Sequence, residues 1–308
     1  MTTAALDIGS NSFHLLIASV TPAGLVAEHR YKQTVQLGAG LDADNNLTHL
    51  AIERGLKSLR SFVTILNQHQ VSKVYCVATN TLRLANNADE FIQHAECILL
   101  SSIDVISGDD EARLIFKGIV QEQPRSGSGM VMDIGGGSTE FAFGNAEAIP
   151  ETCSLQMGCV SYSSRFFSDG KIYPENTQAA IAASRLCLEP ELGRLRKTHG
   201  GWMVGTSGTV QSIADVCHEL YQTDKNLVLR DHLEDLLKRL ILVGHVDKIN
   251  FNSIEIGRSG ILPAGLCICL STMQQLKINT MHVGRSSLVE GLLLDKTHTV
   301  FSELNIPN

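Results

Sequence analysis

Two short stretches of similar pattern decide the fold: AALDIGSNSFHLLIA at residues 4–18 and MVMDIGGGSTEFAF at residues 130–143. In each, an apolar segment is followed by Asp-x-Gly, small polar residues and a second segment rich in β-forming residues. This pattern predicts a strand, a tight turn and a returning strand. The copies stand about one domain length apart, which is too far for a solenoid repeat. We therefore expect two related halves.

Strands and helices alternate along both halves. Residues 50–66 carry apolar side chains at helical spacing, and residues 74–79 form a run of β-forming residues. The second half repeats this order, with residues 204–209 linking a strand to a helix that carries apolar side chains over residues 210–220. Alternation of this kind predicts the α/β class.

Two lobes are expected, one over residues 1–124 and one over residues 125–308. The boundary is placed in the segment 121–129, because its Pro and Gly residues are typical of a linker. A final helix is expected over residues 288–294, with the option of crossing back to pack on the first lobe.

The composition is that of an ordinary globular protein, since 44% of the 308 residues are hydrophobic, 19% are charged and the formal net charge is −7. This balance argues against non-specific nucleic-acid binding, which needs a basic surface. The apolar run 260–270 is too short to cross a membrane, and the N-terminus has no basic signal-peptide segment. The eight cysteines form no CxxC pair, so we expect reduced, mostly buried cysteines in a cytoplasmic protein.

The two Asp-x-Gly turns are candidate phosphate-binding loops. Their glycines let backbone amides approach an anion closely, and successive amides in such a turn form an anion-binding nest. Asp7 and Asp133 supply carboxylates suited to Mg²⁺. The plainer alternative is a pair of tight hairpins with turn aspartates, but two copies at this spacing, one with three consecutive glycines, favour phosphate binding. The candidate phosphate-binding residues are Ser10, Asn11, Ser12, Gly135, Gly136, Gly137, Ser138 and Thr139.

Neither turn belongs to the commonest nucleotide-binding patterns. The sequence contains no GxxxxGK[ST], and no GxGxxG follows a strand. A strand-turn-strand phosphate loop that is used twice is instead typical of the actin, hexokinase and Hsp70 ATPase superfamily.

A third candidate anion site is the helix start formed by Ser207, Gly208 and Thr209. A helix N-terminus after glycine and hydroxyl residues binds anions readily, although Ser207 or Thr209 could equally serve only as a helix cap. Two cations are expected at the site. Arg83 follows a strand end, and Arg258 lies in a loop before an apolar helix.

Glu111 closes the acidic run 109–111 at the start of a predicted helix. Acidic residues stabilise helix N-termini by about 0.3–1 kcal/mol each, so the plain interpretation is structural. The same helix dipole keeps Glu111 ionised, which suits a group that orients a water and accepts its proton. From the residues alone both interpretations stay open.

Together these stretches resemble the exopolyphosphatase/guanosine pentaphosphate phosphohydrolase (Ppx/GppA) family, and the resemblance covers nearly the whole chain. The matching stretches are DIGSNSFHLLIA at 7–18, THLAIERGL at 48–56, ATNTLR at 78–83, ISGDDEARLIF at 106–116, VMDIGGGSTEF at 131–141, MGCVS at 157–161, GTSGTVQS at 205–212, GRSGILPAGL at 257–266 and GRSSLVEGLL at 284–293.

The resemblance implies two ribonuclease-H-like lobes of the actin/hexokinase/Hsp70 ATPase superfamily, with an interlobe cleft. It also implies hydrolysis of terminal phosphoanhydride bonds in inorganic polyphosphate and/or guanosine pentaphosphate, with Mg²⁺ or another divalent cation such as Mn²⁺. The family's water-activating glutamate matches Glu111, the acid of its glycine-rich loop matches Glu140, and a metal-site aspartate matches Asp133. Phosphate-gripping positions and a cleft arginine match Asn11, Gly136, Ser138 and Arg83.

The chain is expected to be a short form, because longer members of the family carry a further C-terminal helical HD-type region. This favours short polyphosphates or guanosine pentaphosphate over long chains. Two alternatives stay open: a regulatory protein that binds guanosine phosphates without hydrolysing them, and an ATP-dependent kinase or ATPase of the same superfamily. Nucleic-acid and membrane partners are not expected, and a homodimer is left open.

Overall fold

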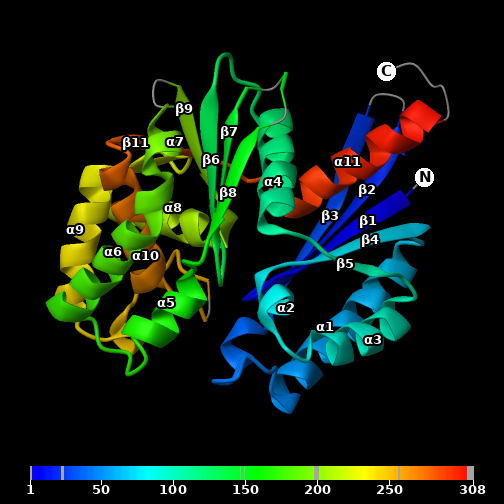
Figure 1. Cartoon of the computed structure of the whole chain (residues 1–308), viewed down its shortest axis with the longest axis horizontal. Coiled ribbons are helices and arrows are strands. Elements are labelled where there is room, and N and C mark those ends of the chain that lie inside the picture. Colours follow the sequence, from blue (N-terminus) through cyan, green and yellow to red (C-terminus); the bar gives the residue numbers. More distant parts are fainter. Residues whose placement is uncertain are drawn as a thin grey trace. The chain divides into compact units, whose positions relative to one another are not determined.

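The computed structural model describes residues 2–21, 24–145, 147–148, 150–197, 201–255 and 257–303 (Figure 1). Among these residues no helix is long and apolar enough to cross a membrane. All eight cysteines are free thiols and six of them are buried, so the prediction of unpaired, mostly buried cysteines is confirmed.

Strands and helices alternate along the chain as expected. The strands are β1 (Thr2–Ile8), β2 (Ser12–Thr21), β3 (Gly24–Thr34), β4 (Lys73–Ala78), β5 (Ile103–Val105), β6 (Gly129–Ile134), β7 (Thr139–Gly144), β8 (Glu151–Leu155), β9 (Trp202–Thr206), β10 (Leu227–Leu229) and β11 (Thr280–Val283). The helices are α1 (His49–Gln68), α2 (Asn80–Leu84), α3 (Ala88–Leu99), α4 (Gly108–Glu122), α5 (Cys159–Phe166), α6 (Pro174–Leu188), α7 (Leu192–Lys197), α8 (Ser207–Tyr221), α9 (Arg230–Val243), α10 (Leu262–Gln275) and α11 (Leu288–Glu303).

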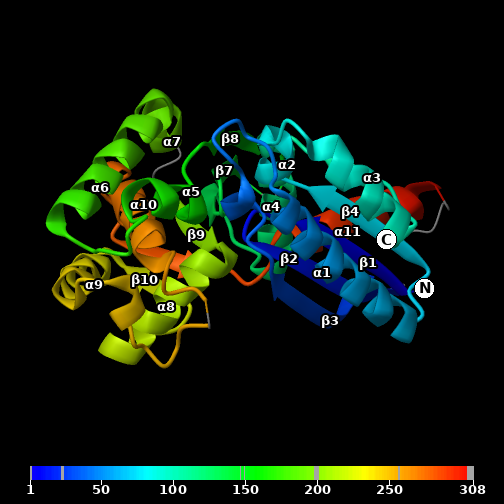
Figure 2. The ribbon, with the colours of Figure 1, turned by 90° about the horizontal axis from the view of Figure 1, so that it is seen from below.

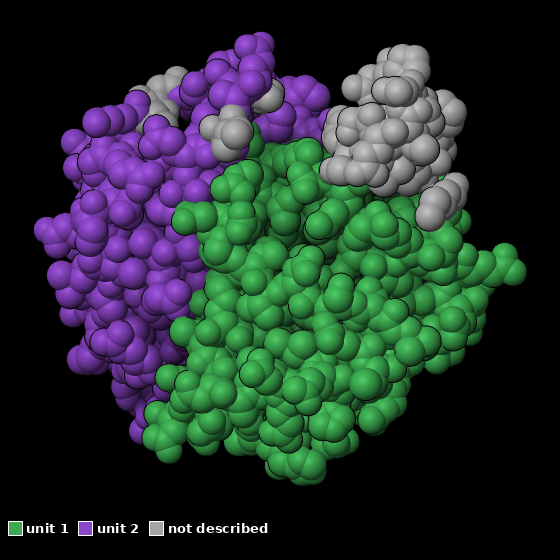
Figure 3. All heavy atoms as spheres, turned by 45° about the vertical axis from the view of Figure 1, so that its right-hand side comes forward, with its two compact units in different colours: residues 1–118, 286–308 green, residues 119–285 purple. Residues whose placement is uncertain are grey.

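The chain divides into two compact units, which Figure 3 colours separately. Unit 1 consists of residues 1–118 and 286–308, and unit 2 consists of residues 119–285. The sequence placed the first boundary after residue 124, whereas the units divide inside α4. Local packing explains this position. A Cβ on Gly118 would lie 3.1 Å from the Ser287 carbonyl of unit 1, whereas Ile119 packs against Gly284 of unit 2.

The sheet of unit 1 has the strand order β3-β2-β1-β4-β5 in the described residues. Strand β2 runs antiparallel to both β1 and β3, and β4 and β5 continue the sheet parallel to β1. Helices α1 and α3 pack together on one face, and α11 lies against β1 and β2 on the other (Figures 1 and 2). The core of unit 1 includes Leu6, Phe13, Phe62 and Phe91, all fully buried.

The sheet of unit 2 repeats this arrangement. Its order is β10-β11-β9-β6-β7-β8, in which β6, β7 and β8 are antiparallel and β9 and β11 continue the sheet parallel to β6. Helices α5, α6, α8, α9 and α10 form a layer on one face (Figure 1). The shared strand order is that of the ribonuclease-H-like fold, so the predicted α/β class with two such lobes is confirmed. The internal echo in the sequence reflects a duplicated sheet.

The candidate site residues gather at one edge of each sheet. In unit 1, Asp7 pairs with Val77 and Ala78 with Val105, so the carboxyl ends of the parallel strands β1, β4 and β5 meet. In unit 2, Asp133 pairs with Thr206 in the same way. Loops that follow such strand ends are the usual place for ligand sites in α/β sheets.

Candidate active site

The first candidate phosphate loop joins β1 to β2 in unit 1. The amides of Val35 and Gln36 donate to the Asn11 carbonyl at 2.9 and 2.8 Å, and the Gly38 amide donates to the Ser10 carbonyl at 2.8 Å. These three hydrogen bonds tie the turn to the segment that follows β3. Ser10 and Ser12 are both buried, at 5% and 6% exposure.

Arg83 and Glu111 are brought together in unit 1, although they lie on different helices. Arg83 sits on α2 after β4, and Glu111 sits in the first turn of α4 after β5. The Arg83 Nη1 atom donates to Glu111 Oε2 at 2.9 Å and to the Ile106 carbonyl at 2.9 Å. Both side chains are largely shielded, at 20% and 12% exposure. A carboxylate that only caps a helix needs no arginine partner. The pair with Arg83 therefore indicates a further role for Glu111.

The rest of the first turn of α4 shows the structural role that acidic residues have at a helix start. The Asp110 amide donates to Ser107 Oγ at 3.1 Å, and Ser107 Oγ donates to Asp110 Oδ2 at 2.6 Å. The hydrogen bonds from Ser107 and Arg113 lower the pKa of Asp110. Ser107 therefore caps the helix with Asp110 as its partner, and Glu111 is the acid of this run that contacts Arg83.

The glycine-rich loop of unit 2 turns between β6 and β7. The Gly135 amide donates to the Ser138 carbonyl at 2.9 Å, which closes the turn. Gly135, Gly136 and Gly137 are partly exposed, whereas Ser138 is buried. Thr139 is fully buried and its hydroxyl donates to the Met157 carbonyl, so this side chain holds the loop to the segment before α5.

Asp133 and Glu140 form a buried acid pair in unit 2. They face each other across β6 and β7, with 9% and 1% exposure. Burial, and then the charge of Glu140, raise the pKa of Asp133 to about 8. Ser154 Oγ donates to Glu140 Oε1 at 2.8 Å. Two buried carboxylates side by side disfavour each other's charge, and a divalent cation relieves that repulsion.

The acid pair suits Mg²⁺ or Mn²⁺, which prefer hard oxygen ligands and are commonly held by one or two carboxylates together with substrate phosphates. Among the described residues no group of three or more His, Cys, Asp or Glu side chains is arranged to hold a metal ion. Asp7, the matching residue of unit 1, stays a predicted metal ligand.

The start of α8 follows β9 in unit 2. Ser207 has a φ of 89°, in the left-handed region that serine seldom adopts, and such strain is concentrated at functional sites. Its Oγ accepts hydrogen bonds from the amides of Thr209 and Val210 at 3.1 and 3.4 Å. The hydroxyl of Ser207 therefore caps the helix, and phosphate binding at this turn stays a prediction.

Arg258 lies directly over this helix start. A Cβ on Gly208 would fall 2.0 Å from Arg258 Nη2, so the glycine is what lets the guanidinium approach the backbone. Arg258 is 7% exposed and its Nε donates to Glu255 Oε2 at 2.9 Å. The Glu255 carboxylate offsets the unfavourable interaction between this guanidinium and the helix dipole. Anion binding by Arg258 stays a prediction.

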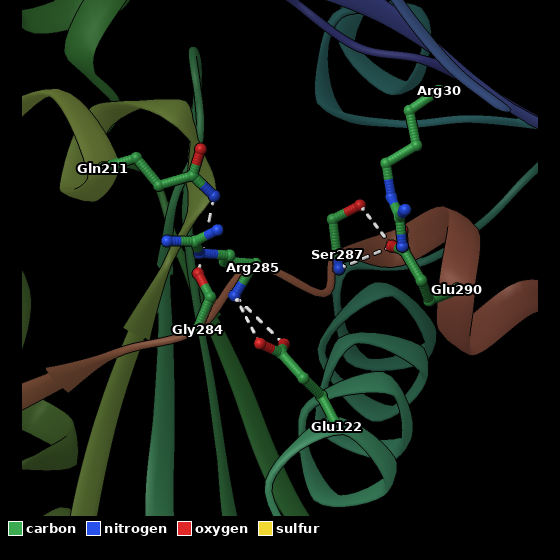
Figure 4. A network of polar contacts seen from close by, with 7 residues as sticks. All are labelled: Arg30, Glu122, Gln211, Gly284, Arg285, Ser287 and Glu290. Atoms are coloured by element: carbon green, nitrogen blue, oxygen red, sulfur yellow. Dashed lines mark hydrogen bonds and ion pairs between the residues drawn. The ribbon is translucent and has the colours of Figure 1, made fainter. Parts of the chain in front are cut away.

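Sequence reasoning gave no role to the turn after β11, the third parallel strand end of unit 2. Figure 4 shows its contacts: the Arg285 amide donates to both carboxylate oxygens of Glu122, at 3.0 and 3.2 Å, and Gln211 Nε2 donates to the Gly284 carbonyl at 3.4 Å. Within unit 1, Glu290 accepts from the amide and hydroxyl of Ser287. Only the strand order could have shown that Arg285 follows the end of a parallel strand next to β9.

The duplicated ribonuclease-H-like sheets, each with a phosphate-type loop after its first strand, define an α/β protein of the actin-like class. The chain belongs to the Ppx/GppA phosphatase family, whose model matches residues 16–300. The resemblance seen in the sequence is therefore confirmed, and membership supports a phosphatase function.

Solved structures share the fold over nearly the whole chain. An exopolyphosphatase from Cytophaga hutchinsonii ATCC 33406 is 24% identical with a TM-score of 0.88, and the match covers 97% of this chain and 98% of that one. The PPX-GPPA enzyme of Aquifex aeolicus is 24% identical with a TM-score of 0.77, and the match covers 96% of this chain and 99% of that one.

Proposed function

We propose that this protein hydrolyses the terminal phosphoanhydride bond of inorganic polyphosphate and/or guanosine pentaphosphate, with a water activated by Glu111 and with a divalent cation such as Mg²⁺. The observation that carries the proposal is the Arg83–Glu111 pair at the carboxyl edge of the unit 1 sheet, in a chain of a phosphatase family. The relative named as an exopolyphosphatase supports polyphosphate as one substrate class.

In the proposed reaction Glu111 orients a water and accepts its proton as the water oxygen bonds to the terminal phosphorus. The bond from that phosphorus to the bridging oxygen breaks, which gives orthophosphate and a chain shorter by one phosphate. Arg83 and the N-terminus of α4 stabilise negative charge on Glu111, so it is ready to act as a base.

Phosphate oxygens are assigned to the two loops, to the start of α8 and to Arg258. In unit 2, Asp133, with Glu140 beside it, would hold a divalent cation, and Asp7 is the predicted metal ligand of unit 1. When bound, the cation neutralises charge on the phosphate groups and polarises them. Glu140 is buried and accepts a hydrogen bond from Ser154, so its side chain has little freedom to move. We therefore assign Glu140 to keeping the acid pair in place.

Phosphate release tests the proposal. Long polyphosphate, tripolyphosphate and guanosine pentaphosphate are each incubated with the protein, with Mg²⁺ or with excess EDTA. We expect release of orthophosphate that depends on the metal, and the preferred substrate names the activity. Binding of guanosine pentaphosphate without any release would point to the regulatory alternative, and transfer from ATP to an acceptor would point to a kinase.

A further inference from the structure

The first turn of α5 is bonded to the glycine-rich loop through its backbone amides. The Cys159 amide donates to the Gly135 carbonyl at 2.9 Å, and the amides of Val160 and Ser161 donate to the Gly136 carbonyl at 2.8 and 3.1 Å. Amides at a helix start have no partner inside the helix and ordinarily bind a cap, water or an anion. Here they bind carbonyl groups of the loop, so this helix start is not itself an anion site.

Two side-chain features complete this junction. Ser161 Oγ accepts a hydrogen bond from the Gly158 amide at 3.2 Å. Its single proton is shared between the carbonyls of Gly158, at 3.2 Å, and Gly137, at 3.4 Å. A Cβ on Gly158 would lie 2.2 Å from the Gly136 carbonyl oxygen. Gly158 has a φ of −128°, which any residue adopts, so it is the close approach to the loop that requires glycine.

The consequence for the loop follows from peptide geometry. In a trans peptide the carbonyl and the following amide point in opposite directions. The carbonyls of Gly135, Gly136 and Gly137 all point to the first turn of α5. The amides of the next residues, Gly136, Gly137 and Ser138, therefore turn away from α5. Consecutive amides that point to one side form an anion-binding nest.

We propose that Gly158 and Ser161 are positioning residues, and that the first turn of α5, Gly158–Ser161, sets the amides of the glycine-rich loop for a phosphate group. The identity of the anion rests on the proposed function. Neither residue touches the substrate in this arrangement; both act through the carbonyls of the loop. The stretch MGCVS at 157–161 thereby receives a physical role, because its glycine and serine are the two residues that the contact requires.

Affinity for tripolyphosphate, measured by calorimetry with Mg²⁺, tests the proposal separately from turnover. Ser161→Ala removes the bond to the Gly137 carbonyl, and we expect about fivefold weaker binding and a KM raised by a similar factor, with a much smaller change in kcat. Ser161→Thr keeps the hydroxyl and should restore the affinity to within about twofold of wild type. Ser164→Ala, an exposed serine on the same helix, is the matched control and should bind as wild type.

Gly158→Ala provides a second, stronger change. The added methyl group must displace the Gly136 peptide, so we expect binding to weaken on the order of tenfold or more. Gly193→Ala is its control, because a Cβ there meets nothing within 4 Å. Circular dichroism and thermal unfolding establish that each variant is folded. If Gly158→Ala does not fold, the serine series decides by itself.

The outcomes separate this inference from the proposed function. Folded Ser161→Ala and Gly158→Ala proteins that bind tripolyphosphate as tightly as wild type would overturn the inference, even if the wild type hydrolyses it. A wild-type protein that binds tripolyphosphate without releasing phosphate would contradict the proposed hydrolysis, and weaker binding by the two variants would still uphold the inference. A wild-type protein that binds neither tripolyphosphate nor guanosine pentaphosphate would overturn both.

Discussion

Arg83 separates the two interpretations that the acidic run at the start of α4 allows. A helix-capping acid needs no arginine, yet Arg83 bonds both Glu111 and the Ile106 carbonyl. If Arg83 orients the base, Arg83→Ala should lower kcat/KM for polyphosphate by about a hundredfold. Arg113→Ala removes an exposed arginine that pairs with Asp110 in the same helix and should change kcat/KM by less than about twofold. Equal losses in both variants would contradict the assignment.

The acid pair of unit 2 gives a prediction about stability. Asp133 and Glu140 are buried next to each other, and a bound divalent cation relieves their repulsion. We expect Mg²⁺ in millimolar excess to raise the Tm of the wild type, because a ligand that binds only the folded state stabilises it. Asp133→Asn should abolish that rise, since it removes both the repulsion and the ligand.

The control for this experiment is Asp169→Asn. Asp169 is an exposed aspartate that pairs with Lys171 on the surface, so its removal should leave the response to Mg²⁺ intact. A thermal shift that persists in Asp133→Asn, or that fails to appear in the wild type, would count against a cation at the acid pair.

At the residue scale, the sequence is a good guide to the residue types that suit the chemistry. It is a poorer guide to the hydrogen-bond partner of each side chain. The sequence singled out the Asp-x-Gly turns, Glu111 and Arg258 because glycines, acids and arginines are informative in such patterns, and their functional roles stay predictions. The hydroxyls of Ser207 and Thr139 proved to hold the backbone in place, by capping α8 and by bonding the Met157 carbonyl. A hydroxyl can bind a phosphate or a nearby backbone group, and the sequence does not distinguish these partners.

At the element scale, the crossing of α4 and α11 in unit 1 depends on one glycine. A Cβ on Gly291 would lie 1.8 Å from the Leu114 carbonyl oxygen, which belongs to the backbone and cannot rotate away. Gly291→Ala should therefore lower the free energy of unfolding by about 1–3 kcal/mol, although alanine favours helices. Urea denaturation of this variant beside Gly193→Ala checks it, and a Gly291→Ala protein as stable as wild type would contradict the described packing.

The same elements show why the lobe boundary was placed several residues late. Pro124 and Gly127 mark the loop between α4 and β6, and a sequence pattern shows such a loop clearly. The division of the chain falls earlier, between Gly118 and Ile119, inside a continuous helix. Apolar periodicity indicates that α4 is a helix with one buried face. It does not indicate which unit packs against that face.

At the scale of the whole molecule, the duplicated sheet was the most predictable feature. Each unit has its own core, with Phe13 fully buried in unit 1 and Phe141 fully buried in unit 2. Each of these aromatic residues lies near the start of the strand after its Asp-x-Gly turn. Strand order was less accessible, because β11 is only four residues long and pairs with β9 across a long stretch of sequence. Its carboxyl end is followed by Arg285, to which sequence reasoning gave no role.

The measurement that bears most directly on the whole account compares the wild type with Glu111→Gln. Orthophosphate released from tripolyphosphate and guanosine pentaphosphate is followed with Mg²⁺, and calorimetry follows substrate binding by both proteins. We predict that Glu111→Gln binds the substrate but loses phosphate release by at least about a hundredfold, because glutamine cannot accept the proton of the attacking water. A folded Glu111→Gln protein that releases phosphate at the wild-type rate would contradict the account.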